Sequence, residues 1–190
     1  MHFEQSLRNT TYQPWKSHYI DYAKLKKLLR ETESHLDEDP ATRRQDDRDD
    51  WTESDESRFV EELVNVQLDK VNDFQAATSK RLRERTTACE RTLDELSGAG
   101  GDQSDGGSGE EARRAHRKAK LGEVLEELDS ITRETHELER FSRINFTGFL
   151  KAAKKHDRKR GEMYRVRPLL QVRLAALPFN SEDYSPLLYR

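Results

Sequence analysis

Two long runs of helical periodicity constrain the fold of this 190-residue chain more than any other feature. In the first run, apolar residues recur every three, four, seven or eight positions up to about residue 97, with no glycine or proline between them: Val60, Leu63, Val71, Phe74, Leu82, Cys89, Leu93 and Leu96. This spacing places them on one face of a helix. We therefore expect a long helix, capped at its start by Ser54 or Ser57.

The second run begins near Glu110 and extends at least to His156. Its apolar face comprises Leu121, Val124, Leu125, Leu128, Ile131, Leu138, Phe141, Asn145, Phe149 and His156. Gly148 weakens this helix by about 1 kcal/mol but need not end it. Neither long helix can bury its apolar face alone, so we expect the two to pack as antiparallel neighbours.

Shorter helices are predicted at both ends of the chain. Asp21 is a good N-cap for a helix with apolar positions at Tyr22, Leu25, Leu28 and Leu29. Pro168 suits the first turn of a helix over residues 169–177, and Pro178 ends it. The expected fold class is all-α, with a short N-terminal helical hairpin on two long antiparallel helices, short C-terminal helices and a three-helix-bundle core.

Two segments interrupt this pattern. Residues of about 33–52 are acidic and aperiodic, and residues of about 98–111 are rich in Gly and Ser, so both are predicted to be flexible loops. We expect residues 1–190 to form a single domain, and the abrupt end after Leu188 suggests a fragment of a longer protein. With no run of eighteen apolar residues, the chain is expected neither to span a membrane nor to begin with a signal peptide.

The net charge of −3 hides a strong segregation of charge. Residues 151–173 carry nine Lys or Arg against two acids, a net of +7, and residues 1–31 carry six against three, a net of +3. Residues 37–62 carry twelve acids against four Arg, a net of −8. Both ends are therefore basic and the middle of the chain is acidic, which the net charge alone conceals.

The clearest basic cluster lies on one face of the second long helix, opposite its apolar face: Lys151, Lys154, Lys155 and Arg158. No interleaved Glu pairs with this stripe, and a basic N-terminal segment is available to meet it through Lys24, Lys26, Lys27 and Arg30. The alternative is a solvated helix surface. Tyr22 neighbours Lys26 and is either a core aromatic or a phosphate donor. His156 is expected to be an interior histidine, and Asp157 to cap a helix or pair with cations.

Signals of an enzyme are missing from the sequence. It contains no phosphate-binding G-x-x-x-x-G-K-[ST] loop, no G-x-S-x-G turn and no cluster with metal-ligand spacing. Cys89 is the single cysteine, which excludes intrachain disulfides and cysteine-based zinc sites. We expect no catalytic residues, no metal site and no cofactor.

Two motifs resemble those of SPX domains: residues 19–29 (YIDYAKLKKLL) and residues 144–158 (INFTGFLKAAKKHDR). The opening Met1-His2-Phe3 and the two long helices fit the same family. The resemblance implies a helical phosphate-status sensor that binds inositol pyrophosphates or inositol hexakisphosphate. Carried over by motif, the ligand-binding residues are Tyr22, Lys26, Lys151, Lys154, Lys155 and Arg158. His2 stands where many members have Lys, and Arg158 where Lys is usual.

Residues 51–63 and 181–190 are most similar to the accessory subunits of the fungal vacuolar transporter chaperone complex, which makes polyphosphate. That resemblance implies other subunits of the complex as partners, and a place on the cytosolic face of the vacuole membrane in the full-length protein. The alternative function is a scaffold whose basic surface docks on an acidic protein, an anionic membrane or a nucleic acid. A nucleic acid is disfavoured because aromatic residues do not interleave the short basic patch.

Overall fold

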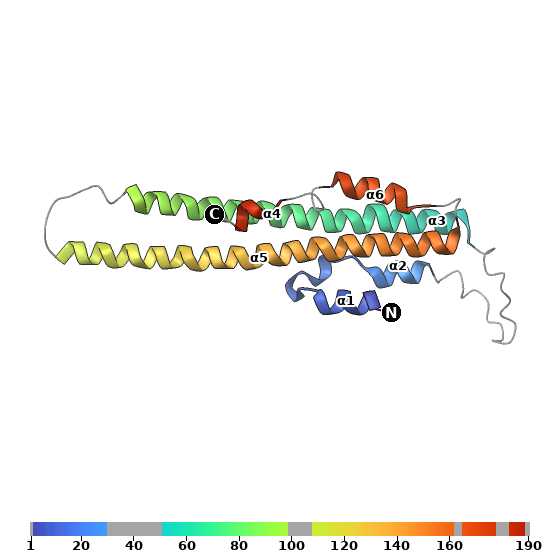
Figure 1. Ribbon diagram of the computed structural model, residues 1–190, viewed down its shortest axis with the longest axis horizontal. Helices are drawn as coiled ribbons and strands as arrows, with labels where there is room; N and C mark the ends of the chain where they lie inside the picture. The colour runs from blue at the N-terminus through green and yellow to red at the C-terminus, as the bar shows by residue number, and fades with distance from the viewer. Residues whose placement is uncertain (1, 30–50, 99–107, 162–164, 178–182, 189–190) are drawn as a thin grey trace. The chain divides into compact units, whose positions relative to one another are not determined.

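The computed structural model describes residues 2–29, 51–98, 108–161, 165–177 and 183–188, and the regular structure of these residues is entirely helical (Figure 1). The all-α fold class is therefore confirmed. The elements in order are α1 (His2–Thr10), the 3-10 helix η1 (Gln13–His18), α2 (Tyr22–Leu28), α3 (Glu53–Val60), the π-helical segment η4 (Glu61–Gln67), α4 (Leu68–Gly98), α5 (Ser108–Arg160), α6 (Arg167–Ala176) and α8 (Ser185–Leu188).

The helix ends agree with the sequence predictions at most positions. The Asp21 side chain caps α2 by accepting from the Lys24 backbone N–H, and a proline lies in the first turn of α6. The predicted N-cap at Ser54 or Ser57 is wrong, because Thr52 caps α3. Its hydroxyl accepts from the Asp55 N–H while the Asp55 carboxylate accepts from the Thr52 N–H, so both backbone groups are satisfied earlier in the chain.

The two predicted loops lie largely outside the described residues, which exclude 30–50 and 99–107. The described chain divides into two compact units. Unit 1 consists of Met1–Ala76 and Arg140–Glu182, and unit 2 of Ala77–Glu139 and Asp183–Arg190.

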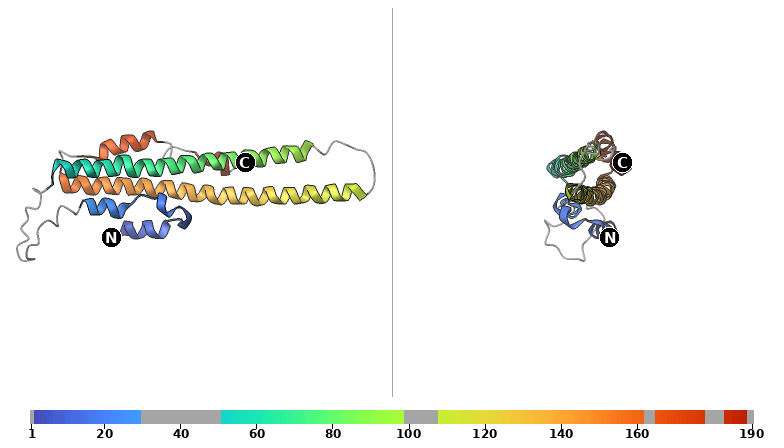
Figure 2. Two further views of the ribbon diagram at one scale, coloured as in Figure 1. Left: turned by 180° about the vertical axis from the view of Figure 1, so that it is seen from behind. Right: turned by 90° about the vertical axis from the view of Figure 1, so that its left-hand side faces the viewer.

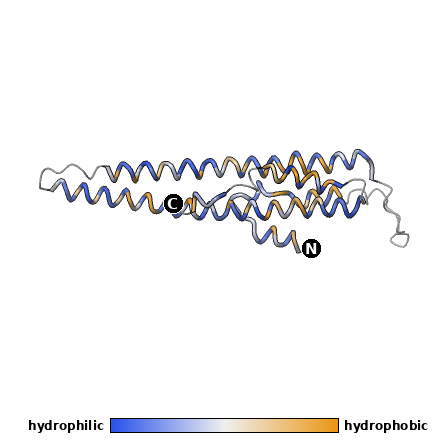
Figure 3. Tube along the Cα trace, turned by 45° about the horizontal axis from the view of Figure 1, so that its top comes forward, coloured by the Kyte–Doolittle hydropathy of each residue, from blue (hydrophilic) through white to orange (hydrophobic). Residues whose placement is uncertain are grey.

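Unit 1 has an aromatic core. The Trp15 ring meets Phe74 at 5.3 Å and Phe141 at 6.1 Å between centroids, and Tyr19 meets Phe141 at 4.7 Å. Within this unit α2 runs beside the C-terminal part of α5, and α6 lies against η4 (Figures 1 and 2), where Arg173 Nη1 donates to Asn65 Oδ1 at 3.4 Å. Apolar stretches gather where these helices run together (Figure 3). The other buried apolar side chains of this unit include Leu25, Leu29, Phe59, Leu63, Val71, Phe149, Leu170 and Leu174.

Unit 2 pairs the rest of α4 with the rest of α5. Leu82 and Cys89 of α4 are buried, as are Val124, Ile131 and Leu138 of α5. The expectation that Leu121 and Leu125 also belong to the apolar core is wrong, because they are 44% and 56% exposed. At about 100° per residue they fall roughly 60° and 100° around the helix from Val124, at the edge of the buried face.

Candidate ligand-binding site

The backbone entering α2 is held by a buried amide of α5. The Ile20 N–H donates to Asn145 Oδ1 at 2.8 Å, and Asn145 Nδ2 donates to the Phe141 carbonyl at 2.7 Å. Asn145 is fully buried, so both of its amide atoms satisfy groups that water cannot reach. This contact fixes the start of α2 against α5.

A second buried amide holds the same segment from η4. The Asp21 N–H donates to Gln67 Oε1 at 2.8 Å, and Gln67 Nε2 donates to Glu62 Oε1 at 2.7 Å. The other Glu62 oxygen accepts from Lys24 Nζ at 2.7 Å. Because a π-helical turn has i→i+5 hydrogen bonds, it brings Glu62 and Gln67 close together. Together with the Asp21 cap, these contacts orient Tyr22 and Lys26.

The side chains that α5 contributes to the site are set by which face of this helix is buried. Ala152, Ala153 and His156 are at most 2% exposed. With that face turned inward, Lys151, Lys154 and Arg158 are exposed and Lys155 is half-buried. Lys159 Nζ also donates to the Leu29 carbonyl, which ties the end of α2 to the end of α5.

His156 is an interior histidine, as predicted. Its ring stacks on Phe59 with centroids 4.8 Å apart, and its Nε2 lies 2.9 Å from Glu56 Oε2. Its Nδ1 lies 3.1 Å from Asp157 Oδ1, which also accepts from the Val166 N–H at 2.9 Å. Asp157 Oδ2 also accepts from the Arg167 N–H at 3.2 Å, so Asp157 anchors the chain entering α6.

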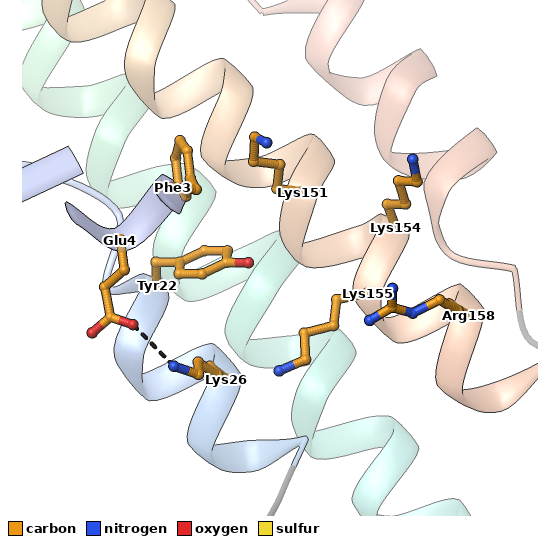
Figure 4. A pocket seen from close by; sticks show the side chains of 8 residues that line it. All are labelled: Phe3, Glu4, Tyr22, Lys26, Lys151, Lys154, Lys155 and Arg158. Atoms are coloured by element: carbon orange, nitrogen blue, oxygen red, sulfur yellow. Dashed lines mark hydrogen bonds and ion pairs between the residues drawn. The ribbon is translucent and has the colours of Figure 1, made fainter. Parts of the chain in front are cut away.

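All six predicted site residues line one open cavity of about 390 Å³, together with Phe3 and Glu4: Tyr22, Lys26, Lys151, Lys154, Lys155 and Arg158. We call this cavity the basic pocket. Figure 4 shows the Tyr22 hydroxyl directed toward α5 and the lysines arranged around it. The side chain of His2 and all of Arg30 lie outside the described parts of the chain.

Two residues of the basic pocket were missed from sequence. The Phe3 ring meets Tyr22 edge-on at 5.0 Å, and the Lys151 ammonium lies 5.4 Å from the Phe3 centroid. Glu4 Oε2 lies 3.0 Å from Lys26 Nζ. The spacing of Glu4 and Arg8 on a short helix was a usable signal for α1, but nothing local indicates that α1 reaches the pocket.

The electrostatics fix the protonation states of Tyr22 and Glu4 in the pocket. Burial and the negative charge of Glu4 raise the pKa of Tyr22, and they outweigh the positive charge of Arg158, which would lower it. At neutral pH its hydroxyl therefore keeps the proton that it donates. The hydrogen bond and charge of Lys26 lower the pKa of Glu4, so this carboxylate is ionised.

The described residues contain no group of His, Cys, Asp or Glu side chains placed to hold a metal ion. None of the described helices is long and apolar enough to cross a bilayer. A helical hairpin lies on long helices with a basic pocket between them, and this is the arrangement that the resemblance to SPX domains predicts.

Comparison with known proteins identifies the relatives of this chain. Subunit 2 of the vacuolar transporter chaperone complex of Saccharomyces cerevisiae is 41% identical over 190 residues, the whole of this chain. Subunits 2 and 4 of that complex in Schizosaccharomyces pombe are 36% and 34% identical over 188 and 190 residues. The chain is homologous over its whole length to the N-terminal region of these SPX-containing subunits.

The chain spans only about a fifth of the length of these relatives, covering 20%, 22% and 23% of them. No protein-family model matches the chain.

Proposed function

We propose that the basic pocket binds inositol pyrophosphates and related inositol polyphosphates such as inositol hexakisphosphate. The observation that carries this proposal is the convergence of six donor side chains from α2 and α5 on one open cavity. A highly phosphorylated inositol carries several phosphate groups, each able to accept charge-assisted hydrogen bonds from Lys or Arg. A single orthophosphate engages few of these donors, so it should bind weakly.

The raised pKa of Tyr22 supports a specific role for its hydroxyl. Among the described residues the hydroxyl has no hydrogen-bond partner, and it is directed toward the lysines of α5 (Figure 4). A protonated phenol in this position donates to a phosphate oxygen. Lys26 and Lys155 approach the same space from opposite sides, so one ligand would join α2 to α5.

At the scale of the cell, we propose that the domain is a non-catalytic sensor. Its relatives are subunits of the vacuolar transporter chaperone complex. Ligand binding would fix α2 against α5, and other subunits of a polyphosphate-making complex would respond to that state. The full-length protein would then place the domain on the cytosolic face of the vacuole membrane.

Calorimetry with inositol hexakisphosphate tests the site. The variant Tyr22→Phe, Lys26→Ala, Lys155→Ala should bind at least about a hundredfold more weakly, since it loses three donors to charged phosphates. The matched control is Tyr12→Phe, Lys16→Ala, Lys80→Ala, which makes the same chemical changes outside the basic pocket. It should bind like the parent, and added salt should weaken binding of both.

Equal binding by the site variant and the parent would disprove the site. If the parent binds anionic vesicles or random DNA and RNA but not inositol hexakisphosphate, the alternative scaffold function holds instead. Far-UV circular dichroism and urea unfolding of each variant establish that a loss of binding is not a loss of folding.

A further inference from the structure

One residue of the basic pocket has the wrong charge for an anion site. Among the described residues that line it, Glu4 is the one carboxylate. Its Oε2 lies 3.0 Å from Lys26 Nζ (Figure 4), and its Oε1 lies 3.1 Å from Arg8 Nη2. A phosphate oxygen that binds Lys26 competes with this carboxylate oxygen for the ammonium group.

The packing of α1 holds Glu4 in this position. Phe3, its neighbour in α1, packs edge-on against Tyr22 and under the Lys151 ammonium. Phe3 can come this close because residue 148 of α5 is a glycine, where a Cβ would stand 3.2 Å from Phe3 Cζ. The start of α1 is therefore fixed at the pocket, and Glu4 reaches Lys26 from there.

A purely structural ion pair is the simpler explanation, and exposure argues against it. The Glu4 and Lys26 side chains are 26% and 27% exposed, and Arg8 is 76% exposed. Ion pairs with this much access to water contribute little to folding stability. The same carboxylate engages the ammonium group that a ligand phosphate would bind, so it competes with that ligand for Lys26.

We propose that Glu4 is an internal competitor of the ligand: it occupies Lys26 in the free protein and lowers the affinity of the basic pocket for inositol polyphosphates. This inference rests on the proposed function. It assigns Glu4 the task of setting the ligand concentration at which the pocket fills. Binding then has two parts, the loss of the Glu4–Lys26 pair and the gain of the Lys26–phosphate contact.

The test compares Glu4→Gln with Glu61→Gln by calorimetry with inositol hexakisphosphate at one salt concentration. Both variants lose one negative charge from unit 1, but Glu61 is exposed on η4 and lies outside the basic pocket. Glu4→Gln should bind about three- to tenfold more tightly than the parent, and Glu61→Gln within about twofold of it. Each change is repeated in a Lys26→Met background, where Glu4→Gln should change the affinity by less than about twofold.

The outcomes separate the inference from the proposed function. Tighter binding by Glu4→Gln that disappears with Lys26→Met supports the competitor role. If the parent binds and Glu4→Gln binds equally well or more weakly, the competitor role is wrong while the function stands. An equal gain from Glu61→Gln also overturns it, since net charge alone would then explain the effect. Absence of binding by the parent and by Glu4→Gln overturns both.

Discussion

Asn145 shows how one side chain can hold a site that it does not touch. Its amide oxygen accepts from the Ile20 N–H, just before the Asp21 cap of α2, and its amide nitrogen donates to the Phe141 carbonyl. Loss of the side chain would leave the Ile20 N–H buried without a partner, which costs more than the net worth of one hydrogen bond. The position of Tyr22, two residues further on, depends on this bond.

Replacement of Asn145 by Ala should therefore lower the free energy of unfolding by about 1–3 kcal/mol and weaken ligand binding. The control is Asn65→Ala, at an exposed position of η4 whose side chain bonds only exposed groups among the described residues. It should cost less than about 0.5 kcal/mol. Urea unfolding of both variants measures the difference, and equal costs would show that the Asn145 bond does not hold α2.

Sequence predicted single residues well where their neighbours along a helix determine them. The basic stripe and the buried Ala152 and Ala153 follow from helical spacing. Periodicity also placed Asn145 on the inner face, but its partner Ile20 lies 125 residues away, and no local pattern predicts such a pair. Glu4 was missed for the same reason, because its role depends on the docking of α1.

At the scale of elements, a close approach at Gly148 brings α1 and the chain before α2 onto α5. A Cβ at this position would stand 3.0 Å from Ile20 Cγ2 and 3.2 Å from Phe3 Cζ, closer than side chains normally pack. Glycine in a helix interior is unfavourable by about 1 kcal/mol relative to alanine. Gly148 therefore weakens the helix, but because it has no side chain the N-terminal elements can pack closely against α5.

A pair of glycine variants tests this account. Gly122→Ala, at an interior position of α5 with open space around it, should stabilise the chain by up to about 1 kcal/mol. The free energy of unfolding of Gly148→Ala should be at least about 1 kcal/mol lower than that of Gly122→Ala. Gly148→Ala should also weaken inositol hexakisphosphate binding, since Phe3 and Ile20 must move. Thermal unfolding and calorimetry measure both effects. An equal gain in stability from the two variants would contradict the close approach.

The elements themselves were predictable where periodicity is long and uninterrupted. Both long helices and the α2 and α6 helices follow from it. The π-helical segment η4 was not predicted, because its cause is tertiary: Glu62 and Gln67 meet groups from Asp21 and Lys24. An ordinary α-helical turn would hold the Glu62 and Gln67 side chains further apart. The spacing of apolar residues does not indicate that these two side chains must meet.

At the scale of the whole molecule, ionised carboxylates stabilise both units. In unit 1, burial is the strongest influence on the pKa of Glu62 and would raise it, but the bonds from Lys24 and Gln67 outweigh burial and lower the pKa. In unit 2, the hydrogen bond from Arg85 lowers the pKa of Glu127. A carboxylate with a lowered pKa takes up its proton more readily in the unfolded chain. Its stabilisation is complete above the ordinary carboxylate pKa of about 4.3 and is lost as the pH falls through the lowered value.

Arg85 is the centre of the network in unit 2, so its replacement should change both stability and its dependence on pH. Its Nε donates to Glu127 at 2.6 Å, its Nη1 to Glu134, and its Nη2 to Ser130 Oγ at 3.1 Å. Arg85→Met should lower the free energy of unfolding by about 1–2 kcal/mol at pH 7. As the pH falls from 7 to 3 the difference should shrink, because protonation of Glu127 removes a charge that attracts the guanidinium.

The matched control is Arg91→Met, at an exposed position of the same helix. It should change stability by less than about 0.5 kcal/mol at both pH values. Urea unfolding at pH 7 and pH 3 gives the four differences. A cost for Arg85→Met that persists undiminished at pH 3 would mean that the side chain stabilises unit 2 through contacts that do not titrate, such as its hydrogen bond to Ser130. A cost that shrinks with acid would assign the stabilisation to its ion pair with Glu127, whose pKa is lowered by Arg85.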